Sequence, residues 1–346
     1  MIDSWRGLAA TGVVCYHLEL KAPFDLGQLC VLAFFVISGY CIAANVESCR
    51  RKQIGLGTYL FRRLRRIYPP YFLSICYFLA TRLLKLHLAL GNQLSRSPII
   101  WIQNLTMTQW LTLLRHPMPC AYLNPSLFVA GYWSLNYEEQ FYLVMGLMMV
   151  VASARGRSLA LSVVGLMIPA LVWNLLHPAK FYGVFLEYWI AFAVGSLVYI
   201  RLCSLQTPRG RFTVDVGLLF LLLFALACHW NFIGVQTGSV YLIWAITSCF
   251  ALCLIYLRPW DDRFKRTWLG RFLNRLGLIS YSVYLTHQCN LSASLALANK
   301  LVHWGLPVQC VFGIRLVSIL CAGALFWYFC ERPFLNHGQR NKPAPA

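Results

Sequence analysis

The chain has 346 residues, of which 59% are hydrophobic and only 12% are charged, and its mean hydropathy is +0.60. Soluble domains average about 45–50% apolar and about 25% charged residues, so this composition excludes an ordinary soluble protein and indicates a polytopic α-helical membrane protein. The net charge of +19 would point to nucleic acid in a soluble protein. Here the placement of the charge matters more, and no nucleic-acid partner is expected.

The sequence predicts about ten transmembrane helices, because apolar runs of about 20 residues recur along it. The approximate ranges are 4–21, 26–46, 67–90, 130–153, 158–176, 182–200, 212–230, 238–257, 276–298 and 308–330. The longest outer segment, 91–129, is expected to be interfacial or re-entrant. We expect one membrane-embedded domain over 1–335 and a short cytoplasmic tail over 336–346, with no cleavable signal peptide.

Basic residues predict the orientation of these helices. With the N-terminus inside, the inner loops hold 21 of the 30 Lys and Arg residues. The positive-inside rule places such loops in the cytoplasm. We therefore expect both termini to be cytoplasmic.

The first predicted span carries an arginine at one end and a histidine at the other. Arg6 and His17 are eleven residues apart, which is about three helical turns, so they share a face at depths about 16 Å apart. We expect both to look into one groove. Ionisable groups inside spans are costly and are therefore functional candidates. His17 is the strongest of them because Arg6 shares its face.

Other ionisable residues also fall inside predicted spans, and most have a structural interpretation. They are Glu138, Glu139, Glu187, Asp215, His287 and Arg315. Glu187 and Arg315 fit a structural ion pair or polar contacts between helices, and Asp215 is close enough to the inner end of its span to face headgroups. The fourteen cysteines are scattered without metal-ligand spacing. They fit small apolar packing residues, and no metal site is expected.

Four arginines stand just before the third span: Arg62, Arg63, Arg65 and Arg66. They fit a topological anchor or a contact with anionic membrane lipids. The spacing of Arg63 and Arg66 supports a second interpretation, because three residues put both guanidinium groups on one helix face as a fork for phosphates.

Six short motifs follow one another in order from residue 3 to residue 333. They are D-x-x-R-G-x-x-A…H (Asp3, Arg6, Gly7, Ala10 and His17), F-F-x-x-S-G in Phe34–Tyr40 with Ser38, R-x-x-R-x-x-P (Arg63, Arg66 and Pro69), W-S-L-x-x-E-x-Q-F-Y in Tyr132–Tyr142 with Glu138 and Gln140, S-Y-x-x-Y-L-x-H in Leu276–His287 with Tyr284, and acidic-x-Pro in Glu331–Pro333. Each motif alone is weak. Together they resemble the acyltransferase-3 family of bacterial membrane O-acyltransferases, which modify O-antigens, exopolysaccharides and other glycans.

The resemblance implies an O-acyltransferase, expected to be an O-acetyltransferase, in the bacterial inner membrane. It would move an acyl group from cytoplasmic acyl-CoA, as co-substrate, to a hydroxyl group of a cell-surface or secreted glycan, with no tightly bound cofactor. The implied roles are catalysis for His17 and Glu138, donor binding for Arg6, Arg63 and Arg66, and substrate contact or structure for Ser38, Gln140, Tyr284 and His287.

Several alternatives remain open from the sequence. A transporter or flippase of a glycan or lipid-linked sugar would also fit the spans and buried charges, although the ordered motifs favour the enzyme. His17 could deprotonate the hydroxyl directly or first be acylated itself. Members of the family usually have residues before the opening motif, which favours a native start upstream of Met1. Many also carry an extracytoplasmic esterase-like domain. We expect none here, so that transfer finishes within the membrane domain.

Overall fold

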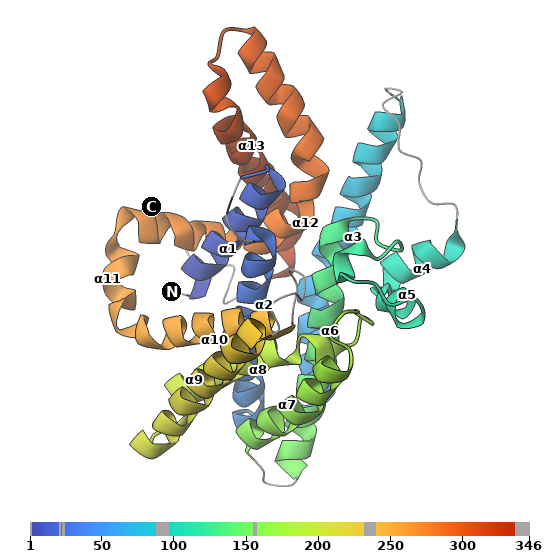
Figure 1. Ribbon diagram of the computed structural model, residues 1–346. Helices are drawn as coiled ribbons and strands as arrows, with labels where there is room; N and C mark the ends of the chain where they lie inside the picture. The colour runs from blue at the N-terminus through green and yellow to red at the C-terminus, as the bar shows by residue number, and fades with distance from the viewer. Residues whose placement is uncertain are drawn as a thin grey trace.

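The computed structural model describes residues 2–20, 22, 25–87, 97–154, 158–231 and 240–335, and within them the chain is almost entirely helical (Figure 1). The longer helices are α1 (Ile2–His17), α2 (Leu26–Arg51), α3 (Leu56–His87), α6 (Trp133–Ala154), α7 (Leu159–Leu176), α8 (Trp189–Tyr199), α9 (Pro208–Asn231), α10 (Val240–Tyr256), α12 (Trp268–His303) and α13 (Val311–Phe326). The short ones are α4 (Pro98–Thr106), α5 (Trp110–Arg115) and α11 (Asp261–Arg266). No strand occurs in these ranges, so the predicted all-α class is confirmed.

Apolar length identifies a membrane protein but not the number of its spans. Four segments of the described chain are long and apolar enough to cross a membrane: Leu26–Arg51, Leu159–Leu176, Pro208–His229 and Val308–Phe334. The pair α10 and α11, bent by 48°, makes a fifth candidate. Each of the ten predicted ranges contains a helix, but the other helices are shorter or more polar. The count of ten and the orientation therefore stay predictions.

Helices α1 and α12 pack with their backbones in direct contact. A Cβ atom added to Gly7 of α1 would lie 2.2 Å from the carbonyl oxygen of Leu273, and one added to Gly277 of α12 would lie 1.8 Å from a carbonyl oxygen of α1. Gly39 and Gly195 bring α2 and α8 together in the same way. Small residues allow such close approach between membrane helices. The glycines of the opening motifs therefore have a packing role.

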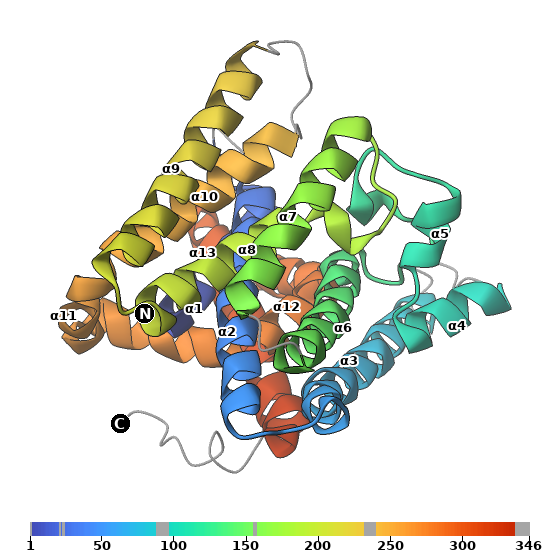
Figure 2. The ribbon, with the colours of Figure 1, turned by 90° about the horizontal axis from the view of Figure 1, so that it is seen from below.

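The other helices pack around α1, α2, α8 and α12. α12 and α13 form a long hairpin at the top of Figure 1, and Figure 2 shows α9 and α10 side by side at one edge, with α4 and α5 at the other, near α3. The predicted interfacial segment thus includes two short helices. Its residues 91–96, like the predicted tail at 336–346, lie outside the described residues.

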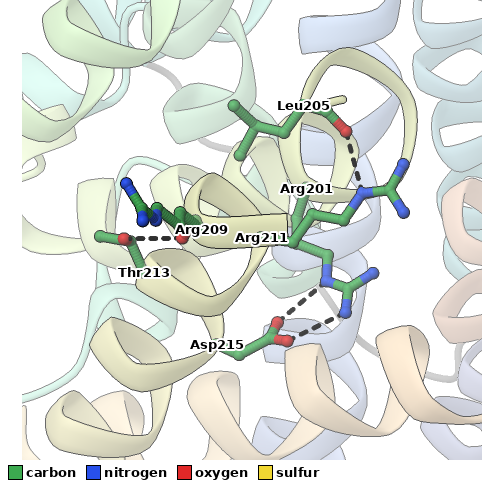
Figure 3. A network of polar contacts seen from close by, with 6 residues as sticks. All are labelled: Arg201, Leu205, Arg209, Arg211, Thr213 and Asp215. Atoms are coloured by element: carbon green, nitrogen blue, oxygen red, sulfur yellow. Dashed lines mark hydrogen bonds and ion pairs between the residues drawn. The ribbon is translucent and has the colours of Figure 1, made fainter. Parts of the chain in front are cut away.

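The first half of α9 is attached to the helical turn that follows α8, Ile200–Ser204, by a bidentate ion pair (Figure 3). Arg201 Nε donates to Asp215 Oδ1 and Arg201 Nη2 donates to Asp215 Oδ2, both at 2.9 Å. Arg211 Nε donates to the carbonyl oxygen of Leu205, also at 2.9 Å. Asp215 is therefore paired with an arginine, and the expectation that it faces headgroups stays a prediction.

Glu187 also has a structural role, but with different partners from those expected. Its carboxylate accepts hydrogen bonds from the hydroxyl of Tyr137 and from the backbone N–H of Tyr182. No ion pair joins it to Arg315 within the described residues, and the interpretation as an ion pair is wrong. The buried carboxylate instead holds the turn before α8.

Candidate active site

Two adjoining cavities lie in the interior, and they have Val31 and Tyr284 in common. The first, of about 110 Å³, is here called the arginine cavity and is lined by Arg6, Ser38, Arg63, Arg66 and Glu138 together with apolar residues. The second, of about 260 Å³, is called the histidine cavity, and its lining includes Tyr16, His17, Trp133, His287 and Gln288. Five of the six sequence motifs, far apart along the chain, therefore supply side chains to one region, and the last motif, Glu331–Pro333, lines neither cavity.

The arginines converge from two helices. α1 supplies Arg6, and α3 supplies Arg63 and Arg66 from successive turns. Both α3 arginines are partly buried at the cavity, whereas Arg62 and Arg65 are exposed on the other side of the helix. The three-residue spacing thus places one pair of guanidinium groups inward and the other pair outward, as helix geometry requires.

The three inward arginines form no direct ion pair with a carboxylate. All eleven acidic side chains lie in the described residues, and none forms an ion pair within 4.0 Å of Arg6, Arg63 or Arg66. The guanidinium carbon of Arg63 lies 5.5 Å from the centre of the Tyr142 ring. Partly buried charges are normally paired, because their removal from water is costly. The arrangement therefore suits an anionic ligand.

Glu138 lies in the arginine cavity and contacts neither histidine. Its Oε1 accepts a hydrogen bond from the Tyr142 hydroxyl at 2.6 Å and another from Ser38 Oγ at 3.1 Å. Two motif residues of α2 and α6 are thereby held at one wall of the cavity. Glu138 is consequently not placed to orient the imidazole of His17.

The two histidines face each other in the second cavity. His17 is the last residue of α1, and His287 is in the middle of α12. Their ring centres are 5.0 Å apart. His287 Nδ1 lies 2.7 Å from the carbonyl oxygen of Tyr284, which can only accept, so this nitrogen carries the proton. His287 Nε2 is then an acceptor, and it is buried with no hydrogen-bond partner.

Gln288 completes the contacts of His17. The Gln288 Nε2 atom lies 3.2 Å from His17 Nε2 and can donate to it, while Gln288 Oε1 accepts from the backbone N–H of Gly131 at 3.2 Å. The sequence gave no reason to select Gln288 except that it follows the last residue of a motif. Tyr142, the final residue of another motif, was missed in the same way.

Tyr284 separates the two cavities. Its hydroxyl donates to the carbonyl oxygen of Gly131 at 2.8 Å and lies 2.6 Å from Ser134 Oγ, so the ring is fixed at the boundary. Arg6 lines one cavity and His17 the other. The expected single groove is thus two adjoining cavities that meet beside this ring.

Gln140 lies outside both cavities. Its Nε2 donates to the carbonyl oxygen of Gly183 at 2.8 Å, and its Oε1 accepts from the backbone N–H of Phe185 at 2.9 Å. These bonds hold the turn before α8. Of the two roles expected for Gln140, the structure places it in a structural one.

Comparisons with known proteins agree with the motifs. The sequence matches the family described as an acyltransferase domain over residues 1–330, which confirms the resemblance. It is 33% identical over 151 residues to O-acetyltransferase OatA of Staphylococcus aureus, an alignment that covers 42% of this chain but only 24% of that protein.

Two further relatives align with nearly the whole chain. One, from Komagataeibacter xylinus and provisionally named membrane-bound transacylase BcsY, is 26% identical over 98% of this chain and 83% of its own length. The other, from Bacillus subtilis and provisionally named peptidoglycan O-acetyltransferase YrhL, is 24% identical over 98% of this chain and 55% of its own. No solved structure matches the chain.

Proposed function

Since the chain belongs to the acyltransferase-domain family, we propose that it is a multi-pass membrane O-acyltransferase. Its donor is cytoplasmic acyl-CoA, its acyl group is acetyl, and its acceptor is a hydroxyl group of a cell-surface or secreted glycan. The observation that carries this proposal is the pair of adjoining cavities, one with unpaired arginines and the other with two facing histidines. The names of the relatives support acetyl as the acyl group.

The arginine cavity suits the donor. Coenzyme A carries several phosphate groups, and guanidinium groups bind phosphate through charge-assisted hydrogen bonds in a fixed planar geometry. Arg6, Arg63 and Arg66 supply three such groups without a competing carboxylate within ion-pair distance. Glu138, held by hydroxyl groups in the same wall, belongs to this side of the site.

The long pantetheine arm would carry the thioester from the arginines past Tyr284 to the histidines. Arg6 and His17 are eleven residues apart on one helix, so this path is about 16 Å along the helix axis. Tyr284 and Val31 line both cavities, so the two cavities adjoin where the arm would have to pass. The donor thus enters from one cavity and reacts in the other.

His17 acts as the general base of the transfer. It takes the proton of the acceptor hydroxyl as the hydroxyl oxygen attacks the thioester carbonyl carbon. The new C–O bond forms, the C–S bond breaks, and the leaving thiolate of coenzyme A takes the proton back from His17. Its unprotonated Nε2, which lies next to the amide of Gln288, suits this role.

The histidine cavity suits a sugar. Aromatic rings line it, and sugars present flat C–H faces that pack against such rings while their hydroxyl groups need polar partners. The rings belong to Tyr16, Tyr122, Trp133, Phe181, Tyr188 and Tyr284. Asp25, Gln28 and Gln288 supply polar groups in the same cavity.

We place the enzyme in the bacterial inner membrane with ten spans and cytoplasmic termini. The inner loops then hold most of the basic residues, which supports this orientation. The arginine cavity would open toward the cytoplasm, where acyl-CoA is present, and the histidine cavity toward the outer side. O-antigens, exopolysaccharides and peptidoglycan are the acceptor classes to test first.

Acetyl-CoA turnover by the purified protein tests the proposal. The wild type should release coenzyme A thiol and transfer radiolabelled acetyl to a glycan, and His17→Ala should lower both rates by about 10²–10⁴-fold. A transporter or flippase would release no thiol. Equal background release by both proteins would therefore contradict the proposed acyltransferase activity. An acetyl group trapped on the wild type, and absent from His17→Ala, would indicate that His17 is acylated before transfer.

A further inference from the structure

A third cavity, of about 410 Å³, adjoins the histidine cavity, and both are lined by Ala130 and Gln288. It is called here the basic cavity because Arg82 and Lys85 of α3 line it. Gln288 contacts His17, so the basic cavity begins immediately beside the catalytic base of the proposed function. No motif in the sequence pointed to this place.

Orientation in the membrane does not explain these two cations. Arg82 is sixteen residues beyond Arg66 on α3, about 24 Å along the helix axis. If the arginines near residue 66 face the cytoplasm, Arg82 and Lys85 lie toward the outer side. The positive-inside rule favours few basic residues there. Their presence therefore calls for another reason.

Both cations are available to a ligand. Neither forms an ion pair within 4.0 Å of any of the eleven acidic side chains, all of which the structure describes. Lys85 Nζ donates to Ser292 Oγ at 2.8 Å, and the guanidinium carbon of Arg82 lies 5.0 Å from the centre of the Phe78 ring. These contacts hold the side chains in place without neutralising their charge.

We propose that the basic cavity binds an anionic group of the acceptor, a phosphate or carboxylate attached to the glycan. The enzyme would thus act on an acidic or phosphate-linked glycan whose reacting sugar occupies the histidine cavity. This inference rests on the proposed function. Anionic lipid headgroups share the same chemistry, but the continuity with the histidine cavity favours a group carried by the acceptor.

Thermal unfolding of the protein in zwitterionic nanodiscs, with coenzyme A saturating the arginine cavity, tests the binding. Glucose 1-phosphate should raise the melting temperature of the wild type, and neutral methyl glucoside should not. In the double variant with Arg82→Gln and Lys85→Gln, half-maximal stabilisation should need at least tenfold more glucose 1-phosphate. A second double variant, with Arg82→Lys and Lys85→Arg, keeps both charges and should largely keep the stabilisation by glucose 1-phosphate. It tests the proposal even if the first double variant is unstable.

Lys300→Gln is the matched control, because Lys300 is an exposed cation of α12 that stacks on Trp304 and lines none of the three cavities. It should respond to glucose 1-phosphate like the wild type. An equal response of the Arg82/Lys85 double variant, or none in the wild type, would overturn the proposal.

Nanodiscs that contain phosphatidylglycerol separate the two sources of the anion. If this lipid stabilises the wild type through Arg82 and Lys85 and glucose 1-phosphate does not, the site holds a lipid headgroup and the proposal is wrong. Release of coenzyme A thiol, measured separately on the wild type, decides the proposed function on its own. Failure of the proposed function can therefore be distinguished from failure of the proposed anion site.

Discussion

His17 and His287 are 270 residues apart in the chain, yet their ring centres lie 5.0 Å apart with the ring planes inclined by 42°. Each histidine follows, by ten residues, a glycine at which α1 and α12 are in backbone contact, Gly7 in one helix and Gly277 in the other. The two helices thus run in parallel and in register. The close contact at the glycines determines how the imidazoles meet about 15 Å further along.

Replacing His287 should slow the chemical step without weakening the binding of the acyl-CoA donor. Asn can still donate to the Tyr284 carbonyl oxygen but lacks the unpaired Nε2 atom that His287 buries beside the cavity. We expect His287→Asn to lower kcat for acetyl transfer by at least tenfold, with the donor KM within twofold of the wild type. Steady-state kinetics with varied acetyl-CoA measures both. His303→Asn, at an exposed histidine of α12, is the control. Wild-type kcat in His287→Asn would show that His287 only packs.

The arginines of α3 distinguish donor binding from simple anchoring. An anchor needs only positive charge, whereas a phosphate fork needs the planar guanidinium, so Arg→Lys is not conservative in a fork. Changing Arg63 and Arg66 to Lys should leave insertion intact and raise the donor KM about ten- to a hundredfold, as expected for the loss of one charge-assisted hydrogen bond worth roughly 1.5–3 kcal/mol.

The outward pair of arginines provides the control for this experiment. Arg62 and Arg65 are exposed on the other side of α3, and their change to Lys should leave the donor KM near that of the wild type. If both double variants keep the wild-type KM, the arginines serve only as an anchor and coenzyme A binds elsewhere.

The packing of α1 on α12 should tolerate no side chain at Gly277. A methyl group there would lie 1.8 Å from a backbone oxygen of Asp3, which cannot move without shifting the helix. Overpacking of this kind costs about 1–3 kcal/mol or more. Gly277→Ala should therefore lower the melting temperature in detergent and reduce acetyl transfer, because His17 moves relative to His287.

Gly313 on α13 gives a matched comparison, since nothing lies within 4 Å of a Cβ atom added to it. Gly313→Ala should keep or slightly raise the melting temperature, because the added methyl group meets no atom and Ala loses less backbone entropy than Gly on folding. Equal melting temperatures for the two variants would mean that α1 and α12 are not in backbone contact.

Reporter fusions test the orientation on which the donor path depends. Fusions at Gln53, Gln206 and Arg266 should report the cytoplasm, because these positions lie in predicted inner segments rich in Lys and Arg. A fusion at Arg115, at the end of α5, should report the outer side. The reverse pattern would place the arginine cavity away from cytoplasmic acyl-CoA, and the proposed donor would then be wrong.

The sequence by itself determined the helical class, the helix face shared by Arg63 and Arg66, and the family. Composition was enough for the all-helical membrane class, because a chain with so much apolar surface must satisfy its backbone hydrogen bonds internally. The three-residue spacing was enough to put Arg63 and Arg66 on one face, since a helix repeats every 3.6 residues wherever it lies. The order of the motifs was enough for the family.

Contacts between distant segments were decided only by the tertiary structure. Spacing along α1 placed Arg6 and His17 on one face but could not show that Tyr284, from α12, divides the space between them. Nor could it show that Glu138 lines the same cavity as the arginines, or that Arg82 and Gln288 line a common cavity. The helix period determines which way a side chain points, whereas the side chain it meets depends on how close the backbones of separate helices come. In this protein small residues such as Gly277 allow that approach.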